Sequence, residues 1–499
     1  MPESSDVLPI FAFDNTYAKE LTDFAVALAP DAVPTPELVY LNHDLADDLS
    51  LNLENTNRDT LAQLFTGQLL PEDATPIAQA YAGHQFGHFN PQLGDGRALI
   101  LGEIINQEQE RYDLCLKGSG RTPFSRGGDG KAAIGPMLRE ALMCEALTAL
   151  GIPSTRALAV ATTGEDVYRQ SVLPGAILTR VASSHIRVGT FEYFACRGEE
   201  QRLKQLADYT IARHDPELAG ADNPYLAFFQ AVLQRQATLI AQWMSMGFIH
   251  GVMNTDNMTI CGETIDYGPC AFMEAYDPNT VFSSIDYHQR YAYHNQPRIA
   301  QWNLSRLGQA LLPLIDTNEN KAVKHASDIL DTFTAYYEHA WLEQMLSKLG
   351  LTPNDTPLDD KPLIVSWLTL LEIQQVDFTL AWRYLADAAQ GNHEPLDTLF
   401  MEKSSLHTWL KQWHERANNE DCDAQTRATA MRNINPWIIP RNHQVEIALA
   451  AASDDNNFQP FNQLMNALQQ PFKESPNYRA FAEPAPEEFT ERYQTFCGT

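Results

Sequence analysis

The stretch FIHGVMNTDNMTICGETIDYGP, residues 248–269, decides the predicted fold. A long helical pattern ends just before it at Gly247, and polar residues then crowd a short loop between apolar segments. Asp256 and Asn257 are adjacent in this loop, and Asp266 follows after a β-type segment. Carboxylate and amide oxygens are the ligands that Mg²⁺ prefers in proteins. The stretch therefore predicts a metal-binding loop, with Asn257 and Asp266 as the candidate ligands.

Two charged residues upstream extend this constellation. Lys117 ends a predicted strand over 112–117, and Glu140 lies in a predicted helix over 136–150 that is apolar at nearly every angle. A carboxylate in such a buried helix needs a cationic partner, because an unpaired buried charge is very costly. Lys117 alone reads more simply as a solvent-facing lysine, but with Glu140 nearby we expect the two to pair. A strand lysine held by a helix glutamate is the arrangement that protein kinases aim at phosphates.

The order of these residues along the chain parallels the kinase order, with one departure. His250 and its glycine precede Asn257, and Asp266-Tyr-Gly resembles the metal-binding Asp-Phe-Gly of kinases. Val252 stands two residues after His250, where kinases place the catalytic aspartate. Asp256 is the nearby carboxylate in the loop. Either the chain has lost catalysis, or Asp256 has taken over the role.

The surrounding pattern predicts an α+β, two-lobed, protein-kinase-like fold with an N-terminal extension and an extra helical C-terminal region. A chain of 499 residues is too long for one ordinary core. Glycine concentrates between residues 83 and 135 among short β-type runs, and the pattern becomes helical from about residue 200. The expected divisions are an extension over 1–75, a β-rich lobe over 76–190, a helical lobe over 191–345 and the C-terminal helices over 346–499.

Basic residues gather near the predicted nucleotide loops of an otherwise acidic chain. Gly94-Asp95-Gly96-Arg97 forms one glycine-rich loop, and a second runs over 118–131. Arginines grouped near a nucleotide can clamp a phosphate through two hydrogen bonds, although any one alone reads as surface charge. The bases in question are Arg97, Arg121, Arg126, Lys131, Arg180 and Arg187.

Composition narrows the function classes. The net charge of −29 argues against a nucleic-acid partner, because binding a phosphate backbone needs a basic footprint. Seven cysteines without a Cys-x-x-Cys pair exclude a zinc ribbon and a dense disulfide framework. The first residues carry acids and no basic segment of a signal peptide, and no apolar run approaches membrane-spanning length. We expect a soluble, cytoplasmic protein with no membrane partner.

Three long blocks resemble the selenoprotein O family. They are YAGHQFGHFNPQLGDGRALILGE, LKGSGRTPFSRGGDGKAAIGPMLRE and FIHGVMNTDNMTICGETIDYGPCAFMEAYDP, and the resemblance extends over about residues 80–311 and the segment INPWIIPRNH. The resemblance implies a kinase-like fold that binds ATP in an inverted orientation. It further implies transfer of AMP to Ser, Thr or Tyr hydroxyls of protein substrates, with release of pyrophosphate.

The resemblance also assigns roles to residues of this chain, with no departure at any matched position. Asp256 matches the proton acceptor, and Asn257 and Asp266 match the ligands of Mg²⁺ or Mn²⁺. The matched nucleotide-binding residues are Gly94, Gly96, Arg97, Lys117, Asp129, Gly130, Glu140, Arg180 and Arg187.

Family members carry a cysteine or selenocysteine near the C-terminus, and Cys497 occupies that region, although the usual Cys-Ser-Ser ending is absent. We predict a reversible disulfide between Cys497 and Cys270, which directly follows the metal-binding loop.

Two rival functions stay open on the sequence. An ordinary phosphotransferase would move the γ-phosphate of ATP, and a non-catalytic scaffold would bind ATP without forming a product. The residues do not decide the protein substrates, Mg²⁺ against Mn²⁺, UTP as a second donor, the oligomeric state or the role of residues 346–499.

Overall fold

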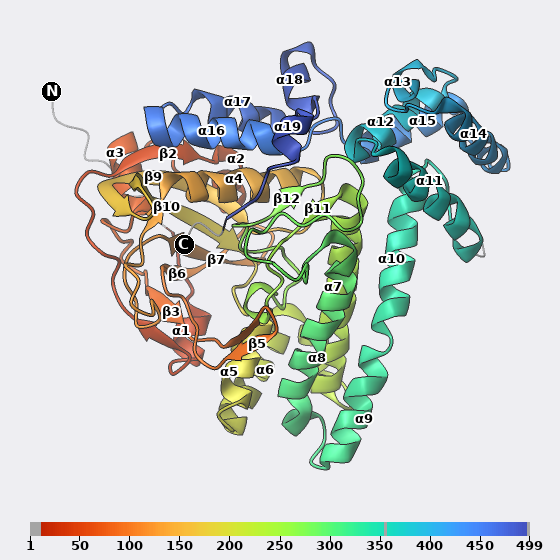
Figure 1. Ribbon diagram of the computed structural model, residues 1–499. Helices are drawn as coiled ribbons and strands as arrows, with labels where there is room; N and C mark the ends of the chain where they lie inside the picture. The colour runs from red at the N-terminus through yellow and green to blue at the C-terminus, as the bar shows by residue number, and fades with distance from the viewer. Residues whose placement is uncertain (1–10, 354–356, 497–499) are drawn as a thin grey trace.

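The computed structural model describes residues 11–353 and 357–496, and combines one large β-sheet with many helices (Figure 1). All neighbouring strands of the eight-stranded sheet are antiparallel, in the order β1-β3-β6-β7-β10-β9-β2, with β8 beside β10. The strands are β1 (Ala25–Ala27), β2 (Glu37–Leu41), β3 (Ile77–Gln79), β6 (Ala98–Ile105), β7 (Arg111–Lys117), β8 (Ala132–Ala133), β9 (Arg156–Tyr168) and β10 (Val172–Ala182).

The centre of the sheet carries the predicted strands. The strand predicted over 112–117 is confirmed as β7, and it pairs with β6. The long strand β9 contains Gly164, which has a positive φ of 72°. Glycine adopts this conformation without steric cost, so the strand continues past the irregularity. β10 pairs with both β7 and β9, and places Leu178 opposite Lys117.

The first part of the chain contributes to this sheet. β1 pairs with β3, and β2 pairs with β9, so that Leu38 lies opposite Ala161. The segment 11–75 therefore packs on the sheet through its own strands, which the sequence pattern did not anticipate. Its helices are α1 (Thr16–Glu20), α2 (His43–Asp48) and α3 (Arg58–Phe65), and a separate hairpin, β4 (Gly83–Gln85) with β5 (His88–Asn90), follows.

Helix α4 (Ile134–Ala149) is the helix predicted over 136–150, and it is buried on nearly all sides. It packs against β9 and β10, and against α16 (Asn442–Asp455) and α17 (Gln459–Leu468) (Figure 1). Its buried carboxylates are paired: Glu140 with Lys117, as the sequence predicts, and Glu145 with Arg156 at 2.8 Å. Pairing offsets the cost of removing these charges from water.

A helical part follows the sheet and carries the loop 248–269. The longest helix, α7, is capped at its start by the Asn223 side chain and ends at Gly247, whose φ of 72° suits a left-handed C-terminal cap. The short pair β11 (Phe248–Ile249) and β12 (Ala271–Phe272) then closes the base of the loop. The helices are α5 (Val188–Ala195), α6 (Glu200–His214), α7 (Pro224–Met246), α8 (Gln296–Ile315), α9 (Glu319–Leu330) and α10 (Phe333–Lys348).

Part of the C-terminal region packs back on the core. α16 and α17 lie along α4, while α11 to α15 group beyond the end of α10 (Figure 1). The fully buried Arg441 binds Glu274 and Asp377, with its Nη1 2.7 Å from an Asp377 carboxylate oxygen. The remaining helices are α11 (Lys361–Gln374), α12 (Phe378–Ala389), α13 (Glu394–Asp397), α14 (Lys403–Ala417), α15 (Ala424–Ile434), α18 (Arg479–Ala482) and α19 (Glu487–Thr490).

None of the helices within residues 11–353 and 357–496 combines the length and apolar character that crossing a membrane requires.

Candidate functional site

A cavity of about 660 Å³ opens between the sheet and the loop 248–269. Eleven of the twelve residues predicted for the site line it, and Arg180 stands behind Glu140 and Asp266. The eleven are Gly94, Gly96, Arg97, Lys117, Asp129, Gly130, Glu140, Arg187, Asp256, Asn257 and Asp266.

Lys117 joins the sheet to the loop. Its Nζ lies 2.6 Å from Glu140 Oε2 and 2.7 Å from Asp266 Oδ1. The ion pair predicted between Lys117 and Glu140 is therefore present. The second contact, to Asp266, places the end of β7 directly against the predicted metal ligand.

Two arginines complete a cluster of cations around Asp266. Arg180 Nη1 lies 2.9 Å from Asp266 Oδ1 and 3.2 Å from Glu140 Oε1. Arg187 Nη1 lies 3.1 Å from Asp266 Oδ2 and donates to the main-chain oxygen of Asp256 at 2.9 Å. Both arginines are almost fully buried. Three buried cations thus meet the carboxylates of Glu140 and Asp266, and Arg187 Nη2 also lies 3.9 Å from Oδ1 of the buried Asp95.

Asp266 is held in an unusual state by these neighbours. Burial alone would raise the pKa of its carboxyl, but Lys117, Arg180 and Arg187 outweigh it and hold that pKa well below its usual range. Its backbone has a positive φ of 65°, which is uncommon for a residue with a side chain. Asp266 is therefore an ionised carboxylate aimed into the cavity.

Asp256 is a buried carboxylate of a different character. Its Oδ2 accepts a hydrogen bond from Gln85 Nε2 at 3.0 Å, and its Oδ1 has no hydrogen-bond partner among the residues that the structure describes. Burial raises the pKa of Asp256 to about 6. A carboxyl group with a pKa near neutral and an oxygen without a hydrogen-bond partner is suited to accept a proton from a substrate.

The loop that carries these residues is braced by polar contacts within itself. His250 Nε2 lies 2.9 Å from the carbonyl oxygen of Ile265, to which it donates, and its Nδ1 accepts from the Val252 main chain at 3.3 Å. Asn257 Nδ2 donates to the Val252 carbonyl at 2.9 Å. This contact fixes the Asn257 amide, so its orientation in the cavity wall is set before any ligand binds.

The glycine-rich loops come close together at the cavity mouth. A Cβ at Gly94 would lie 2.4 Å from the Phe124 ring, and one at Gly130 would lie 2.0 Å from the Gly120 carbonyl oxygen. Asp129, next to Gly130, is partly exposed and pairs with Arg169 at 2.8 Å. A side chain larger than hydrogen would therefore force the two loops apart at Gly94 and would distort the second loop at Gly130.

The other basic residues of the second loop differ in whether they line the cavity and in what they bind. Arg126 lines the cavity. Arg121 donates to the Gly128 carbonyl at 3.0 Å on the surface, and Lys131 lines the cavity but pairs with Glu165 at 2.6 Å.

Sequence reasoning missed residues whose partners are distant in the chain. Gln85 reaches Asp256 from the β4–β5 hairpin, and His185 accepts from Arg180 Nε at 3.2 Å. The Tyr81 ring stacks 4.5 Å from the Arg187 guanidinium carbon. Tyr81 and Gln85 lie in the first block that carries the family resemblance and His185 lies in none of the three, but only the folded chain identifies the partner of each.

Of the two cysteines in the predicted disulfide, the structure describes Cys270. Cys270 is buried, its thiol lies 3.2 Å from the Tyr267 carbonyl oxygen, and burial raises its pKa to about 12. Cys497 lies outside the described residues, so the predicted disulfide stays a prediction.

Comparisons with known proteins show the class of enzyme to which the chain belongs. A protein of Chromobacterium violaceum described as protein nucleotidyltransferase YdiU is 58% identical over 94% of this chain and 98% of its own length. Proteins with the same description from Cereibacter sphaeroides and Rhizobium johnstonii are 55% and 54% identical, each over 98% of this chain. These matches cover 100% and 97% of the two relatives. The chain is an enzyme of the protein nucleotidyltransferase class.

The family follows from a second match. The model of the family described as protein adenylyltransferase SelO matches residues 9–469. The chain belongs to this family, which the sequence resemblance predicted.

Proposed function

We propose that this enzyme transfers AMP from ATP to Ser, Thr or Tyr hydroxyls of protein substrates. The acceptor oxygen forms a bond to the α-phosphorus, the bond from that phosphorus to the bridging oxygen breaks, and pyrophosphate leaves. One observation carries the proposal: the cation cluster around Asp266 lies beside Asp256, a carboxylate that has one oxygen without a hydrogen-bond partner among the described residues. The cation cluster suits the stabilisation of the departing pyrophosphate, and the Asp256 carboxylate suits the acceptance of the proton from the substrate hydroxyl.

The position of the cations supports an inverted nucleotide. Lys117, Arg180 and Arg187 are all buried, so the positive charge lies at the deep end of the cavity. Polyphosphate is stabilised there, and the nucleoside then points outward, the reverse of the arrangement in kinases. Buried cations act strongly on a departing anion because their environment is water-poor and already organised.

Asp256 is the proposed proton acceptor. The position where kinases have an aspartate is Val252, which lines the same cavity and cannot accept a proton. Asp256 also contributes its main-chain oxygen to Arg187, so the acceptor side and the phosphate side of the site share one residue. The short separation suits a reaction at the α-phosphorus.

Asn257 and Asp266 fit a Mg²⁺ or Mn²⁺ ion. Both supply hard oxygen donors to the cavity wall, and the fixed Asn257 amide keeps its oxygen on one side. Within the described ranges no group of three or more His, Cys, Asp or Glu could hold a metal by itself. A site of two protein ligands suits Mg²⁺, which usually takes its remaining ligands from phosphates and water. When bound, the ion would neutralise charge on the phosphates.

The architecture supports a kinase-like fold with two lobes. An antiparallel sheet carries Lys117, the helix behind it carries Glu140, and a mainly helical part carries the loop with Asn257 and Asp266. The four predicted divisions, 1–75, 76–190, 191–345 and 346–499, are kept as a proposal. The strands β1 and β2 and the contacts of Arg441 tie the first and last of these to the centre.

Mass spectrometry of the modified acceptor tests the transferred group. The enzyme is incubated with ATP, Mg²⁺ and a mixture of soluble proteins, and modified peptides are sequenced. We expect AMP adducts on Ser, Thr or Tyr, and a parallel reaction with UTP tests the second donor. Phosphate adducts would instead favour the phosphotransferase, and ATP binding without any adduct would favour the scaffold.

We also propose redox control through Cys270 and Cys497. Support comes from the place of Cys270, whose carbonyl is bound by Arg139 Nη2 at 2.7 Å directly after the metal-binding loop. Forming the disulfide removes two electrons and two protons from the two thiols, which an oxidant of the peroxide class accepts. Because burial keeps the Cys270 thiol protonated, the oxidant reacts first with Cys497, and the Cys270 sulfur then displaces water from the sulfenic acid. Alkylation of free thiols before and after mild oxidation, followed by peptide mapping, tests this. Both cysteines labelled after oxidation would contradict it.

A further inference from the structure

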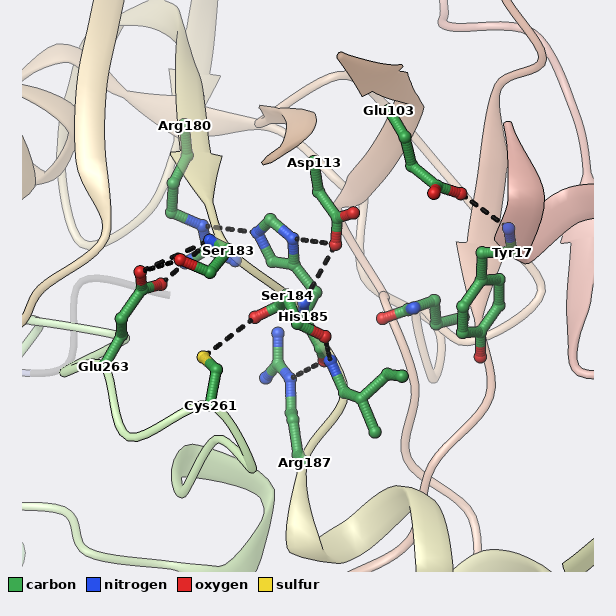
Figure 2. Close-up of polar contacts among 12 residues, drawn as sticks. Tyr17, Glu103, Asp113, Arg180, Ser183, Ser184, His185, Arg187, Cys261 and Glu263 are labelled. Carbon is green, nitrogen blue, oxygen red and sulfur yellow. Dashed lines mark hydrogen bonds and ion pairs between the residues drawn. The ribbon is translucent and has the colours of Figure 1, made fainter. Parts of the chain in front are cut away.

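A buried polar chain stands behind the cation cluster (Figure 2). The His185 ring lies between Asp113 and Arg180: its Nδ1 is 3.0 Å from Asp113 Oδ2, and its Nε2 accepts from Arg180 Nε at 3.2 Å. The main-chain N–H of His185 also donates to Asp113 Oδ2 at 2.9 Å. One carboxylate thus fixes both the ring and the backbone of His185.

The hydrogen bonds define the protonation state of the ring. Arg180 Nε can only donate, so His185 Nε2 must accept, and the ring proton lies on Nδ1 and is donated to Asp113. Burial lowers the pKa of His185, and the nearby Arg180 and Arg187 lower it further, against the opposite effect of Asp113. His185 is therefore neutral, with one defined tautomer.

His185 contacts both arginines of the cluster. Its ring holds Arg180, and its main-chain oxygen accepts from Arg187 Nε at 3.4 Å. In both cases the contact uses the Nε edge of the guanidinium. The Nη1 atoms are left for Asp266, Glu140 and the interior of the site.

A neutral acceptor has an electrostatic advantage here. A carboxylate at this position would orient Arg180 equally well but would cancel its charge. The charge of Asp113 is matched by Arg213, whose Nη2 lies 2.7 Å from Asp113 Oδ1. The chain from Arg213 to Asp113 to His185 therefore adds no net charge beside the cluster.

We propose that His185, fixed by Asp113, is a positioning residue for the nucleotidyl transfer. It holds Arg180 and Arg187 so that their charge is aimed at the phosphates, and it leaves that charge undiminished. The proposal rests on the proposed function for its role in turnover, while the orientation of the two arginines is testable by nucleotide binding alone.

Two substitutions at position 185 separate positioning from general stability. In His185→Gln the amide oxygen can take the place of Nε2 and accept from Arg180. In His185→Asn the shorter side chain can reach Asp113 but leaves Arg180 Nε without its acceptor. Both variants keep a polar amide at the position and differ by one methylene group, so each controls for the other.

Three quantities are measured on the full chain with ATP and Mg²⁺: the melting temperature, the Kd of ATP by calorimetry, and kcat and KM for transfer from α-labelled ATP. We expect similar melting temperatures for the two variants. His185→Asn should lose on the order of 10- to 100-fold in kcat, the scale of a misplaced group. It should also bind ATP more weakly, while His185→Gln stays close to the native chain.

Failure of the positioning role can be distinguished from failure of the proposed AMP transfer. If the native chain forms no product, the proposed function fails, and the Kd values still decide the positioning role. Equal Kd and kcat values for the two variants, or losses that only follow the melting temperature, would overturn the inference.

Discussion

The ammonium of Lys117 lies 2.7 Å from the carboxylate of Asp266, although the two residues are 149 positions apart. This contact joins the end of a sheet strand to the loop that holds the proposed metal ligands. Arg180 and Arg187 bind the same carboxylate. With these partners Asp266 stays ionised, and a bound nucleotide must share the three cations with it. The site is thus organised before its substrate arrives.

The state of Asp256 predicts a pH dependence of activity. Its pKa of about 6 means that the proton-accepting form becomes dominant as the pH rises through 6. We expect kcat/KM for AMP transfer to be half-maximal near that pH and to reach a plateau about one to two pH units above it. In Asp256→Asn the activity should fall by about 10²-fold or more at every pH. An Asn variant with native kcat/KM would exclude Asp256 as the proton acceptor.

Gly130 predicts a test of the loop geometry. Its φ is 71°, and an added Cβ would lie 2.0 Å from the Gly120 carbonyl oxygen. Gly130→Ala should weaken ATP binding about tenfold or more, equivalent to roughly 1.4 kcal/mol. Gly127 has a φ of 87° but open space around it, so Gly127→Ala isolates the backbone strain. Equal Kd values for the two variants, measured by calorimetry, would show that the close approach of Gly130 to Gly120 does not affect ATP binding.

Arg441 predicts how the C-terminal helices contribute to stability. It is fully buried and binds both Glu274 and Asp377. Arg441→Leu leaves two buried carboxylates without their cation, so the free energy of unfolding should fall by about 3–5 kcal/mol. The exposed Arg479 lies 3.7 Å from Glu483, and Arg479→Leu should cost roughly 0–1 kcal/mol. Urea unfolding measures both, and similar losses would contradict a bracing role for Arg441.

Lys348 predicts a stabilising substitution. Its ammonium is buried 3.9 Å from Met246 Sδ and 5.0 Å from the Trp382 ring centroid. Burial lowers the pKa of Lys348 to about 7, below its value of 10.5 in the unfolded chain. The unfolded state therefore binds more protons between these values, and the free energy of unfolding rises with pH from 7 to 10.5.

Lys348→Met removes this cost with a side chain of similar shape. We expect the free energy of unfolding to increase by about 2–4 kcal/mol at pH 6, and by progressively less as the pH approaches 10. Urea unfolding at pH 6 and pH 9.5 checks the difference. An equal gain at both values would mean that packing, not the buried charge, sets the effect.

The sequence predicted the parts of the site that follow chain order and local pattern. Lys117 ends a strand, Glu140 lies in an apolar helix, and the charge rule alone pairs them. It did not predict that β2 pairs with β9, because strand pairing at long range leaves no local pattern. The contact of Gln85 with Asp256, across 171 positions, is invisible for the same reason.

The protonation state of His185, in the polar chain behind the site, could not be predicted from the sequence either. His185 follows SS in an ordinary loop sequence, and nothing local distinguishes it from a surface histidine. Its neutral state depends on burial and on Arg180 and Arg187, which act against the opposite effect of Asp113. Arg180 comes from β10, Arg187 from the start of α5 and Asp113 from β7. Such a state is a property of tertiary structure.

A paired labelling assay tests the central claim most directly. The purified enzyme and its Asp266→Ala variant are each given ATP labelled at the α-phosphate or at the γ-phosphate, with Mg²⁺ and acceptor protein. The account predicts protein-bound label from the α position only, and its loss in the variant. Protein-bound label from the γ position only would make the enzyme a phosphotransferase and contradict the account.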